Sequence, residues 1–528
     1  MPPHVKWRGN CGKTISLLVW QTHESAFSLE KILKRTWNLR RRSIIMKNPK
    51  RSSLVHREVH FQPVTEYAKH IVAAVWTLAV VLNTGHAAAG TAVRDYPSLQ
   101  AALDANPGRM IEIPDGDYPI TEALRIRGSG GGLYGFGRIV QTNPKAPVLH
   151  IEDAEDIRIL SLTLVRPEEA SEAEANGIRC ERSRRIVFDG LRMVDCRARE
   201  AVIELSRCEQ CTVRNVEIRN YQRIAVDDRT GPSHELYGYA FICIDGTGIL
   251  AQRCVGTVIE NNRIVESRML PTKDMKERHK LGSLTEGQYP SKPGTLGESV
   301  FKQRYANNWH QGSAIVVTAP ENSRQTIVRG NVIQNAAQGI DLHCDEALVE
   351  GNMIDCCMIG VKGTHGCRNL NIVNNLIARA DLWGILLNPG AVSHEAEPAR
   401  NGQPARPANE DAGTIIANNI ITDYGYGNEY WNFGGSYAIA LYEGQLDTNP
   451  PLRDILVTGN MVYDTGRDAP IMDGQSPKEP PRYRYAVYVG PWGEDRKKGP
   501  TFPQNIHFAN NIFHPGTKGV SNIEFYNR

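Results

Sequence analysis

The sequence lacks several patterns that would point directly to a function. No Cys-x-x-Cys pair is matched by a second, distant pair, which argues against a structural zinc site. Nothing resembles a nucleotide, haem or flavin site, so neither a nucleotide nor such a cofactor is expected to bind. Amphipathic helical stretches are almost absent, so the fold is expected to be built from strands.

Basic character is confined to the first part of the chain. The formal net charge is +3, but residues 1–89 hold 14 Lys and Arg against 4 Asp and Glu, which leaves the remainder with a net charge of −7. The remainder also has no basic cluster, and nucleic acid is therefore not expected as a partner.

Residues 1–89 have the features of an export leader. Ile71–Leu82 is an apolar run of 12 residues that Lys69 precedes and the sequence His86-Ala87-Ala88-Ala89 follows. The run is too short to span a bilayer comfortably, and the small residues fit cleavage near Ala89 by a signal peptidase. Met46 is a plausible true start that leaves an ordinary basic segment before the run. We expect a secreted or periplasmic protein; a retained single membrane anchor is the alternative.

From about Cys180 onward the chain repeats a unit of about 21 to 25 residues, a period typical of solenoids. Each unit has a β-branched run, an asparagine and a second apolar run, and the apolar residues alternate with period two. An asparagine side chain can hydrogen-bond the same residue in the next coil. The sequence predicts an all-β domain over residues 90–528, a single-stranded right-handed parallel β-helix with a ladder of these asparagines: Asn331, Asn352, Asn375, Asn419, Asn460 and Asn511.

The cysteines fit the interior of such a helix. Of 11 cysteines, Cys208, Cys254, Cys344 and Cys367 each lie seven or eight residues before a ladder asparagine or its equivalent, for which Asn215 and Asn262 serve in the first two coils. This spacing predicts a stack of small buried side chains. Free thiols are expected; a disulfide between Cys344 and Cys367 is the alternative.

The start of the predicted domain carries a second signature. Asp95–Asp104 is expected to form a short amphipathic capping helix, and the sequences MIEIPDGDYPI (Met110–Ile120) and GLYGFG (Gly132–Gly137) follow it. A capping helix, a strand ending in Pro-Asp-Gly-Asp-Tyr and a glycine-rich coil resemble the N-terminal part of the pectate lyase superfamily. The middle of the chain, for example WHQGSAIVV (Trp309–Val317), resembles exported bacterial β-helix proteins. The superfamily includes polysaccharide lyases, glycoside hydrolases and uronate epimerases, so the fold alone does not decide the reaction.

One strand family is expected to carry the functional site. Aligned coils place Ile315, Ile340, Val361 and Ile385 inward, and Asp341 and Lys362 outward with His343 two residues further along. Long insertions flank this family and are expected to wall a groove above it; they are residues 220–238, 268–311, 389–413, 465–484 and 491–504.

The outward residues of that family suit the breaking of an acidic polysaccharide. The predicted catalytic residues are Asp341, His343, Lys362, His365 and Tyr442, and the predicted substrate-binding residues are Arg304, Trp309, His310, Trp383, Asn388 and His394. A lyase that cleaves a uronate polymer by β-elimination needs a base, a cation beside the carboxylate and an acid. His343 or Lys362 can be the base, Lys362 or a metal such as Ca²⁺ on Asp341 can neutralise the carboxylate, and Tyr442 or His365 can be the acid.

Other functions remain open at this point. A uronate C5-epimerase shares the first step of the lyase, and a glycoside hydrolase needs two opposed carboxylates instead. The non-enzymatic alternative is a carbohydrate-binding or adhesive β-helix. Asp341 and Lys362 can also be a plain cross-strand ion pair, the histidines can bond the backbone, and the tryptophans can pack at an edge.

Overall fold

The computed structural model describes residues 91–222, 224–227, 242–268, 270–271, 312–380, 382–425, 436–465, 483–491 and 497–527. The predicted leader, Met46 and the cleavage site near Ala89 lie outside these residues. Of the predicted insertions only 389–413 is described in full, and the other four fall wholly or partly outside. No helix in the described part of the chain is long and apolar enough to cross a membrane.

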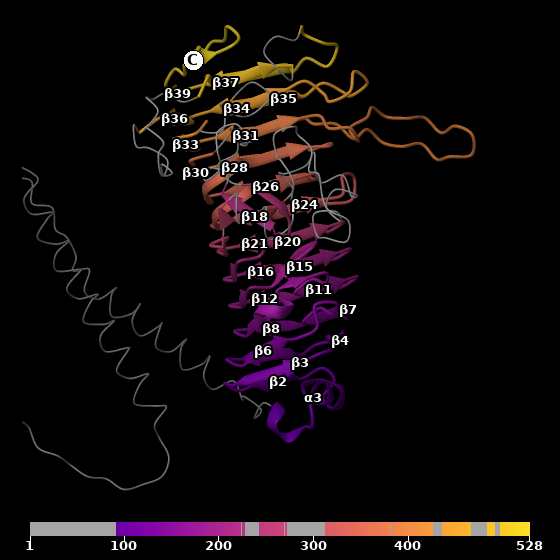
Figure 1. Ribbon diagram of the computed structural model, residues 1–528. Helices are drawn as coiled ribbons and strands as arrows, with labels where there is room; N and C mark the ends of the chain where they lie inside the picture. Colours follow the sequence, from indigo (N-terminus) through magenta and orange to yellow (C-terminus); the bar gives the residue numbers. More distant parts are fainter. Residues whose placement is uncertain are drawn as a thin grey trace, which may run out of the picture. The chain divides into compact units, whose positions relative to one another are not determined.

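The described residues form a right-handed parallel β-helix, as the repeat predicts. Figure 1 shows its coils stacked in sequence order from the α3 end to the β37 end. Each coil contributes one strand to each of three faces, here called A, B and C. Within every face each strand pairs in parallel with strands of the neighbouring coils.

Face A contains β1 (Thr91–Ala92), β2 (Met110–Ile113), β5 (Gly132–Gly135), β8 (Arg158–Leu160), β12 (Val187–Asp189), β16 (Thr212–Arg214), β21 (Val258–Glu260), β25 (Arg324–Arg329), β27 (Asp345–Glu350), β29 (Asn371–Val373), β32 (Ile415–Ala417), β35 (Arg453–Thr458) and β38 (Gln504–Ala509). Face B contains β3 (Asp117–Ile120), β6 (Arg138–Gln141), β9 (Thr163–Val165), β13 (Arg192–Val194), β17 (Glu217–Arg219), β22 (Arg263–Val265), β30 (Leu376–Ala378), β33 (Ile420–Thr422), β36 (Met461–Tyr463) and β39 (Ile512–Phe513).

Face C contains β4 (Leu124–Ser129), β7 (Leu149–Glu155), β11 (Ile178–Glu181), β15 (Ala201–Ser206), β20 (Thr247–Gln252), β24 (Ser313–Thr318), β31 (Trp383–Asn388), β34 (Tyr437–Tyr442), β37 (Tyr485–Gly490) and β40 (Gly519–Ser521). The long strands β26 (Val332–Leu342) and β28 (Met353–Thr364) bend from face B into face C. Two small sheets lie beside the coils: β10 (Glu172–Ala173) with β14 (Arg197–Ala198), and β18 (Ile224–Asp227) with β19 (Ile242–Asp245) and β23 (Leu270–Pro271).

The predicted capping helix is shorter than Asp95–Asp104. A 3₁₀ turn, η1 (Val93–Asp95), precedes α3 (Leu99–Ala105), and the Ser98 side chain caps α3 by accepting a hydrogen bond from the Ala101 amide at 3.1 Å. The serine cap sets the start of α3, because it satisfies an amide that has no partner within the helix. A second 3₁₀ turn, η2, spans Glu168–Ala170.

The asparagine ladder is confirmed at the turn between faces A and B. Each side-chain amide donates to the Oδ1 atom of the next asparagine at 2.9 Å, from Asn262 through the six predicted asparagines to Asn527. The left-handed backbone conformation belongs to the preceding residue, for example Gly351 (φ 63°) and Asn374 (φ 58°). The ladder asparagine supplies the hydrogen bonds, and its neighbour makes the bend.

Asn215 is not part of this ladder, contrary to the prediction. Asn215 has the left-handed conformation (φ 55°), and the following residue, Val216, occupies the ladder position, where its amide donates to Asn262 Oδ1 at 2.9 Å. In this coil the alignment of asparagines is therefore off by one residue, because asparagine serves both positions of the turn.

The stack of cysteines is also present. Nine cysteines are buried free thiols, Cys208, Cys254, Cys344 and Cys367 among them, so Cys344 and Cys367 form no disulfide. Together with the inward residues Ile315, Ile340, Val361 and Ile385, these side chains form the continuous core of the helix.

Candidate functional site

The predicted strand alignment on face C is confirmed. Val316 lies beside Asp341, Asp341 beside Lys362, and Lys362 beside Leu386 in adjacent strands. Although these positions point away from the core, they are not open to solvent: Asp341 is only 3% exposed and Leu386 only 2%. Asp341 is thus a carboxylate in a largely dry environment, where its charge must be stabilised by partner side chains rather than by water.

Asp341, His343 and Lys362 converge on one point. The Oδ1 atom of Asp341 lies 3.0 Å from Nε2 of His343 and 3.3 Å from Nζ of Lys362. Burial alone would raise the pKa of Asp341, but the charges of His343 and Lys362 outweigh it and hold this pKa well below its ordinary value. Asp341 is therefore ionised at neutral pH, and it stabilises positive charge on its two partners.

His343 is engaged at both ring nitrogens. Its Nδ1 atom lies 3.0 Å from the Thr318 hydroxyl, and its Nε2 atom faces Asp341. The Nε2 contact with Asp341 is a close ion pair outside hydrogen-bond geometry, and the Thr318 hydroxyl can donate to Nδ1 of a neutral ring or accept from Nδ1 of a charged ring. His343 therefore has one ring nitrogen beside a carboxylate and the other beside a hydroxyl.

His365 completes a cluster of four. Its ring meets that of His343 edge-on, with 5.0 Å between the centroids. Burial, followed by the charges of His343 and Lys362, lowers the pKa of His365 to about 4. His365 is thus a neutral imidazole at neutral pH. Its buried Nδ1 atom has no hydrogen-bond partner among the described residues, and its backbone is left-handed (φ 67°).

Tyr442 and Trp383 lie in a different cluster. The Trp383 Nε1–H donates to the Tyr442 hydroxyl at 3.2 Å, and Tyr437 and Tyr488 stack face to face beside them with 4.4 Å between centroids. Tyr442 is 1% exposed and Trp383 is 3% exposed. Neither ring offers an open face for a sugar, so this cluster packs the outer side of face C.

The remaining predicted residues are dispersed. Asn388 is buried beside Thr364, and its side chain donates to the Pro389 carbonyl at 3.2 Å. His394 lies in the 389–413 insertion, where its Nε2 atom is 3.0 Å from Glu321. Arg304, Trp309 and His310 lie outside the described residues.

A buried acid that the sequence did not reveal lies directly behind His365. Asp411, at the end of the 389–413 insertion, accepts hydrogen bonds from the amides of Gly366 (3.0 Å) and Cys367 (2.9 Å) and from the Ser393 hydroxyl (2.8 Å). Burial raises its pKa to about 7. Its position within an insertion, outside the repeat, left no periodic signal in the sequence.

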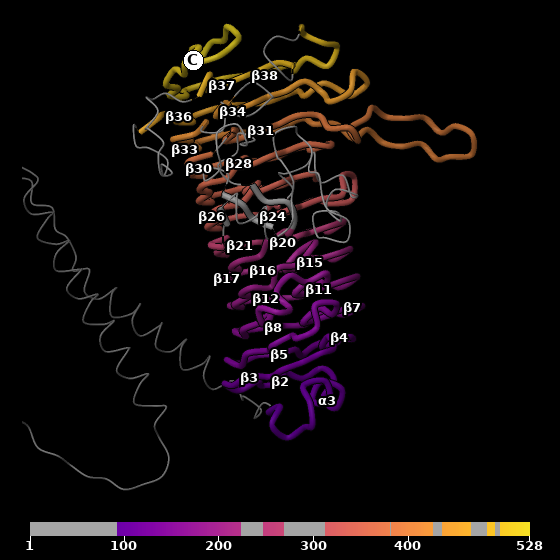
Figure 2. The backbone as a smooth tube through the Cα atoms, viewed as in Figure 1, coloured from indigo at the N-terminus to yellow at the C-terminus, as the bar shows by residue number. Residues whose placement is uncertain are grey.

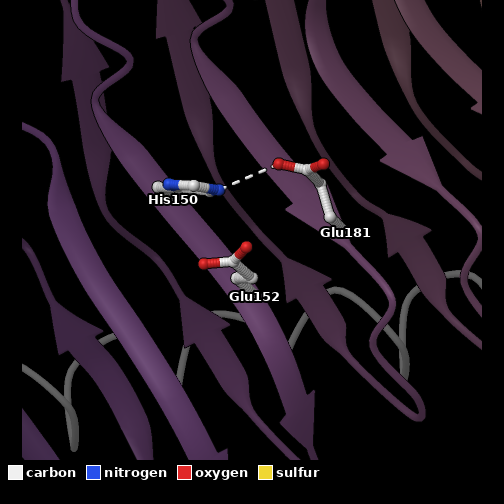
Figure 3. Close-up of side chains that lie close together, drawn as sticks. All are labelled: His150, Glu152 and Glu181. Atoms are coloured by element: carbon white, nitrogen blue, oxygen red, sulfur yellow. Dashed lines mark hydrogen bonds and ion pairs between the residues drawn. The ribbon is translucent and has the colours of Figure 1, made fainter.

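A second polar cluster lies on face C near the N-terminal end. Figure 3 shows His150 and Glu152 on β7 and Glu181 on the neighbouring β11, with His150 Nε2 3.0 Å from Glu181. Their potential ligand atoms lie within 4.8 Å of one another. Arg127 and Arg179 already pair with the two glutamates, at 2.5 Å and 2.7 Å. These arginines oppose a bound cation, so the cluster is best described as an ion-pair network.

The arrangement gives little support to a metal on Asp341. Its Oδ1 atom already has Lys362 and His343 as partners, and a cation such as Ca²⁺ would have to displace one of them. Two cavities in the described part lie elsewhere, one of about 500 Å³ between α3 and β4 and one of about 340 Å³ on face B around Asp355 and Arg379. The predicted groove above face C remains a prediction.

Comparisons with known proteins find similar folds at low similarity. No protein-family model matches the sequence, and a search of curated proteins finds no match. Similar solved structures include a family 28 exopolygalacturonase of Yersinia enterocolitica, with 12% identity, a TM-score of 0.46 and coverage of 79% of this chain and 78% of that one. The A-module of a mannuronan C-5 epimerase of Azotobacter vinelandii has 12% identity, a TM-score of 0.45 and coverage of 83% and 97%. An exopolygalacturonase of Thermotoga maritima has 13% identity, a TM-score of 0.43 and coverage of 69% and 82%.

Proposed function

We propose that this protein is an exported polysaccharide lyase that cleaves a uronic-acid-containing polymer by β-elimination at the cluster of Asp341, His343, Lys362 and His365. The observation that carries the proposal is the convergence of two histidines, a lysine and an ionised aspartate on one buried spot of face C. Perturbed ionisable groups gathered in this way are typical of sites that move protons.

Each group has a role that its surroundings support. His365 is neutral and accepts the proton from C5 of the uronate, because its lowered pKa keeps the imidazole unprotonated. Lys362, whose Nζ lies 3.3 Å from Asp341, binds the uronate carboxylate and so stabilises the negative charge that develops beside C5. The bond from C4 to the leaving oxygen then breaks, a double bond forms between C4 and C5, and His343 as imidazolium protonates the leaving oxygen.

A glycoside hydrolase is the second candidate, and the cluster favours it less. Hydrolysis uses two carboxyl groups, one as acid and one as base or nucleophile. Among the described residues of the cluster Asp341 is the one carboxylate, and its ion pairs keep it from acting as an acid. A uronate C5-epimerase shares the first proton transfer and differs in returning a proton to the opposite face.

The test is incubation of the purified mature protein with a panel of uronate polymers, with and without calcium or a chelator. A lyase produces an unsaturated sugar that absorbs in the ultraviolet, and this absorbance should be lost in Lys362→Ala and His365→Ala. His507→Ala, on exposed face A, is the matched control and should keep full activity. New reducing ends without ultraviolet absorbance would contradict the lyase assignment and indicate a hydrolase. A changed uronate configuration at constant chain length would indicate an epimerase. Binding without any reaction would favour the adhesive alternative.

A further inference from the structure

The insertion between β31 and β32 forms an arm that is anchored at two places. Antiparallel bridges join His394 to Asn409, Glu397 to Arg406 and Arg400 to Gln403, so the arm is a hairpin. Figure 2 shows this hairpin, in orange, extending away from the stacked coils. An arm of this length needs anchors if its base is to keep one position relative to the coils.

The outer anchor reaches across neighbouring coils. His394 Nε2 lies 3.0 Å and Arg406 Nη2 lies 2.8 Å from the same carboxylate oxygen of Glu321. Glu321 belongs to the turn between β24 and β25, whereas the arm leaves the coil of β31. The base of the arm therefore passes the turns of the two intervening coils, and these turns contain His343 and His365.

The inner anchor holds the turn that carries His365. Asp411 accepts the two successive amides of Gly366 and Cys367, and Asn409 Nδ2 donates to the His365 carbonyl at 2.9 Å. The backbone on both sides of the His365 side chain is thus fixed by side chains of the arm. Hydrogen bonds to a charged carboxylate are stronger than those between neutral groups.

His365 needs this support. Left-handed backbone is unfavourable for a residue with a Cβ atom and persists where the surrounding structure enforces it. The imidazole ring contributes little to holding this conformation, because its Nδ1 atom has no hydrogen-bond partner among the described residues. The ring rests on Gly390, where an added Cβ atom would come within 1.9 Å of Nδ1. The direction of the ring is therefore set by the backbone rather than by bonds of the ring.

We propose that Asp411 is the positioning residue for His365, and that through Asp411 and Asn409 the arm fixes the geometry of the candidate site. The inference rests on the proposed function for the role of His365, while the anchor itself is independent of any substrate. Loss of the carboxylate releases two amides and the left-handed turn, and the imidazole loses its fixed direction toward His343 and Lys362.

The charge of Asp411 links this anchor to pH. Burial raises the pKa of Asp411 to about 7. The titratable and charged groups around it are the Cys367 thiol, Asp345, which pairs with Arg368 at 2.5 Å, and His365 on the turn it holds. The adjacent Glu410 pairs outward with Arg453 at 2.8 Å. Because the pKa of Asp411 is higher in the folded protein than in the unfolded chain, its protonation favours the folded state, and its contribution to folding stability should increase as the pH falls through the neutral range.

The experiment compares the full-length wild type with Asp411→Asn and Asp411→Ala by hydrogen exchange and mass spectrometry of peptides that cover residues 362–370. Glu410→Ala is the matched control, because it removes a neighbouring acid whose partner is on the outside. Amide exchange at the 366–367 turn should rise about tenfold or more in both Asp411 variants and stay unchanged in the control. Asn is nearly isosteric with Asp and keeps the variant folded if Ala does not.

A second measurement follows the accessibility of the His365 ring. Acylation of His365 by diethyl pyrocarbonate, followed on the same peptides, should be faster in Asp411→Asn than in the wild type. Unchanged exchange and unchanged acylation would overturn the proposal whether or not any glycan is cleaved. If a polymer is cleaved, Asp411→Asn should lower kcat with little effect on KM, whereas equal kcat values would also overturn it. Silence of the wild type on every polymer would refute the proposed function alone.

Discussion

Asp341 contacts both of its cationic partners through one oxygen, with Oδ1 at 3.0 Å from His343 Nε2 and at 3.3 Å from Lys362 Nζ. The aspartate and the lysine come from neighbouring strands, and the histidine follows Asp341 by two residues. A single buried carboxylate oxygen therefore holds the other two side chains at one point.

Replacement of Asp341 by Asn should destabilise the protein at neutral pH by about 3 kcal/mol or more, because it leaves buried positive charge without a partner. The pKa of Asp341 is lowered on folding, so its contribution is present above the ordinary pKa of an aspartate and is lost as the pH falls through the lower value of the folded state. The difference in unfolding free energy between wild type and variant should hold down to about pH 4 and shrink only below it.

Chemical denaturation at a series of pH values measures this difference. Asp117→Asn is the matched control, because Asp117 pairs with Arg138 at an exposed position and should contribute little. A similar loss in both variants would contradict the role given to Asp341.

His365 should make stability fall in mild acid. Its pKa is lowered to about 4 on folding, so between about pH 6.5 and pH 4 the unfolded chain takes up a proton that the folded chain does not. Folding stability should then decrease by about 3 kcal/mol over this range as the pH falls. His365→Gln should remove this part of the slope and His507→Gln should not. A slope that is equal in all three proteins would count against the buried, neutral imidazole.

The asparagine ladder should be sensitive at its interior rungs. Asn352→Ala removes the acceptor of the Asn331 amide and the donor to the Val328 carbonyl, and it leaves buried groups without partners. We expect a loss of about 3 kcal/mol or more in unfolding free energy. Asn374→Gly, one residue before a rung and left-handed, should change stability little. Thermal unfolding followed by circular dichroism distinguishes the two variants. Equal effects would contradict the assignment of hydrogen bonding to the ladder asparagine and of the bend to the preceding residue.

Gly390 should tolerate no side chain. A Cβ atom there would overlap the His365 ring at 1.9 Å from Nδ1, so Gly390→Ala must displace the imidazole or the arm. We expect faster acylation of His365 and, in a protein active on a uronate polymer, a loss of turnover. Gly402→Asn is the control for mutation of the arm, because Gly402 lies at its tip with open space around it and a left-handed backbone (φ 77°) that asparagine tolerates. Normal reactivity of His365 in Gly390→Ala would show that the ring has room to move.

The repeat predicted the solenoid because each coil obeys the same rule. A side chain that must be inward in one coil must be inward in the next, so Ile315, Ile340 and Val361 could be aligned from sequence alone. The same alignment placed Asp341 beside Lys362 correctly. It could not reveal that these outward positions are buried, because the alignment of coils gives the direction of a side chain and not what covers it.

Alignment of the repeats failed to predict the site correctly at two residues: it included Tyr442, which lies elsewhere, and it missed Asp411. Tyr442 lies in the strand family expected to carry the site, yet it packs with Trp383 on the neighbouring strand and not with the histidines. Asp411 lies where the insertion rejoins the coil, beside Ala412, which bridges Arg368, and it accepts the Gly366 amide in the turn of His365. Position within an insertion is set by tertiary packing, which periodicity does not encode.

The ladder begins at Asn262, and the coils before it share the parallel sheets and the core but lack its buried rungs. Their outer surfaces carry ion pairs between neighbouring coils, such as Arg185 with Asp156 at 2.7 Å and Arg214 with Asp189 at 2.8 Å. Dissolved salt screens exposed charges and leaves buried amide bonds almost untouched. Each coil of a solenoid depends mainly on its neighbours. At high ionic strength, unfolding should therefore begin at the α3 end, while the coils that carry the candidate site remain folded.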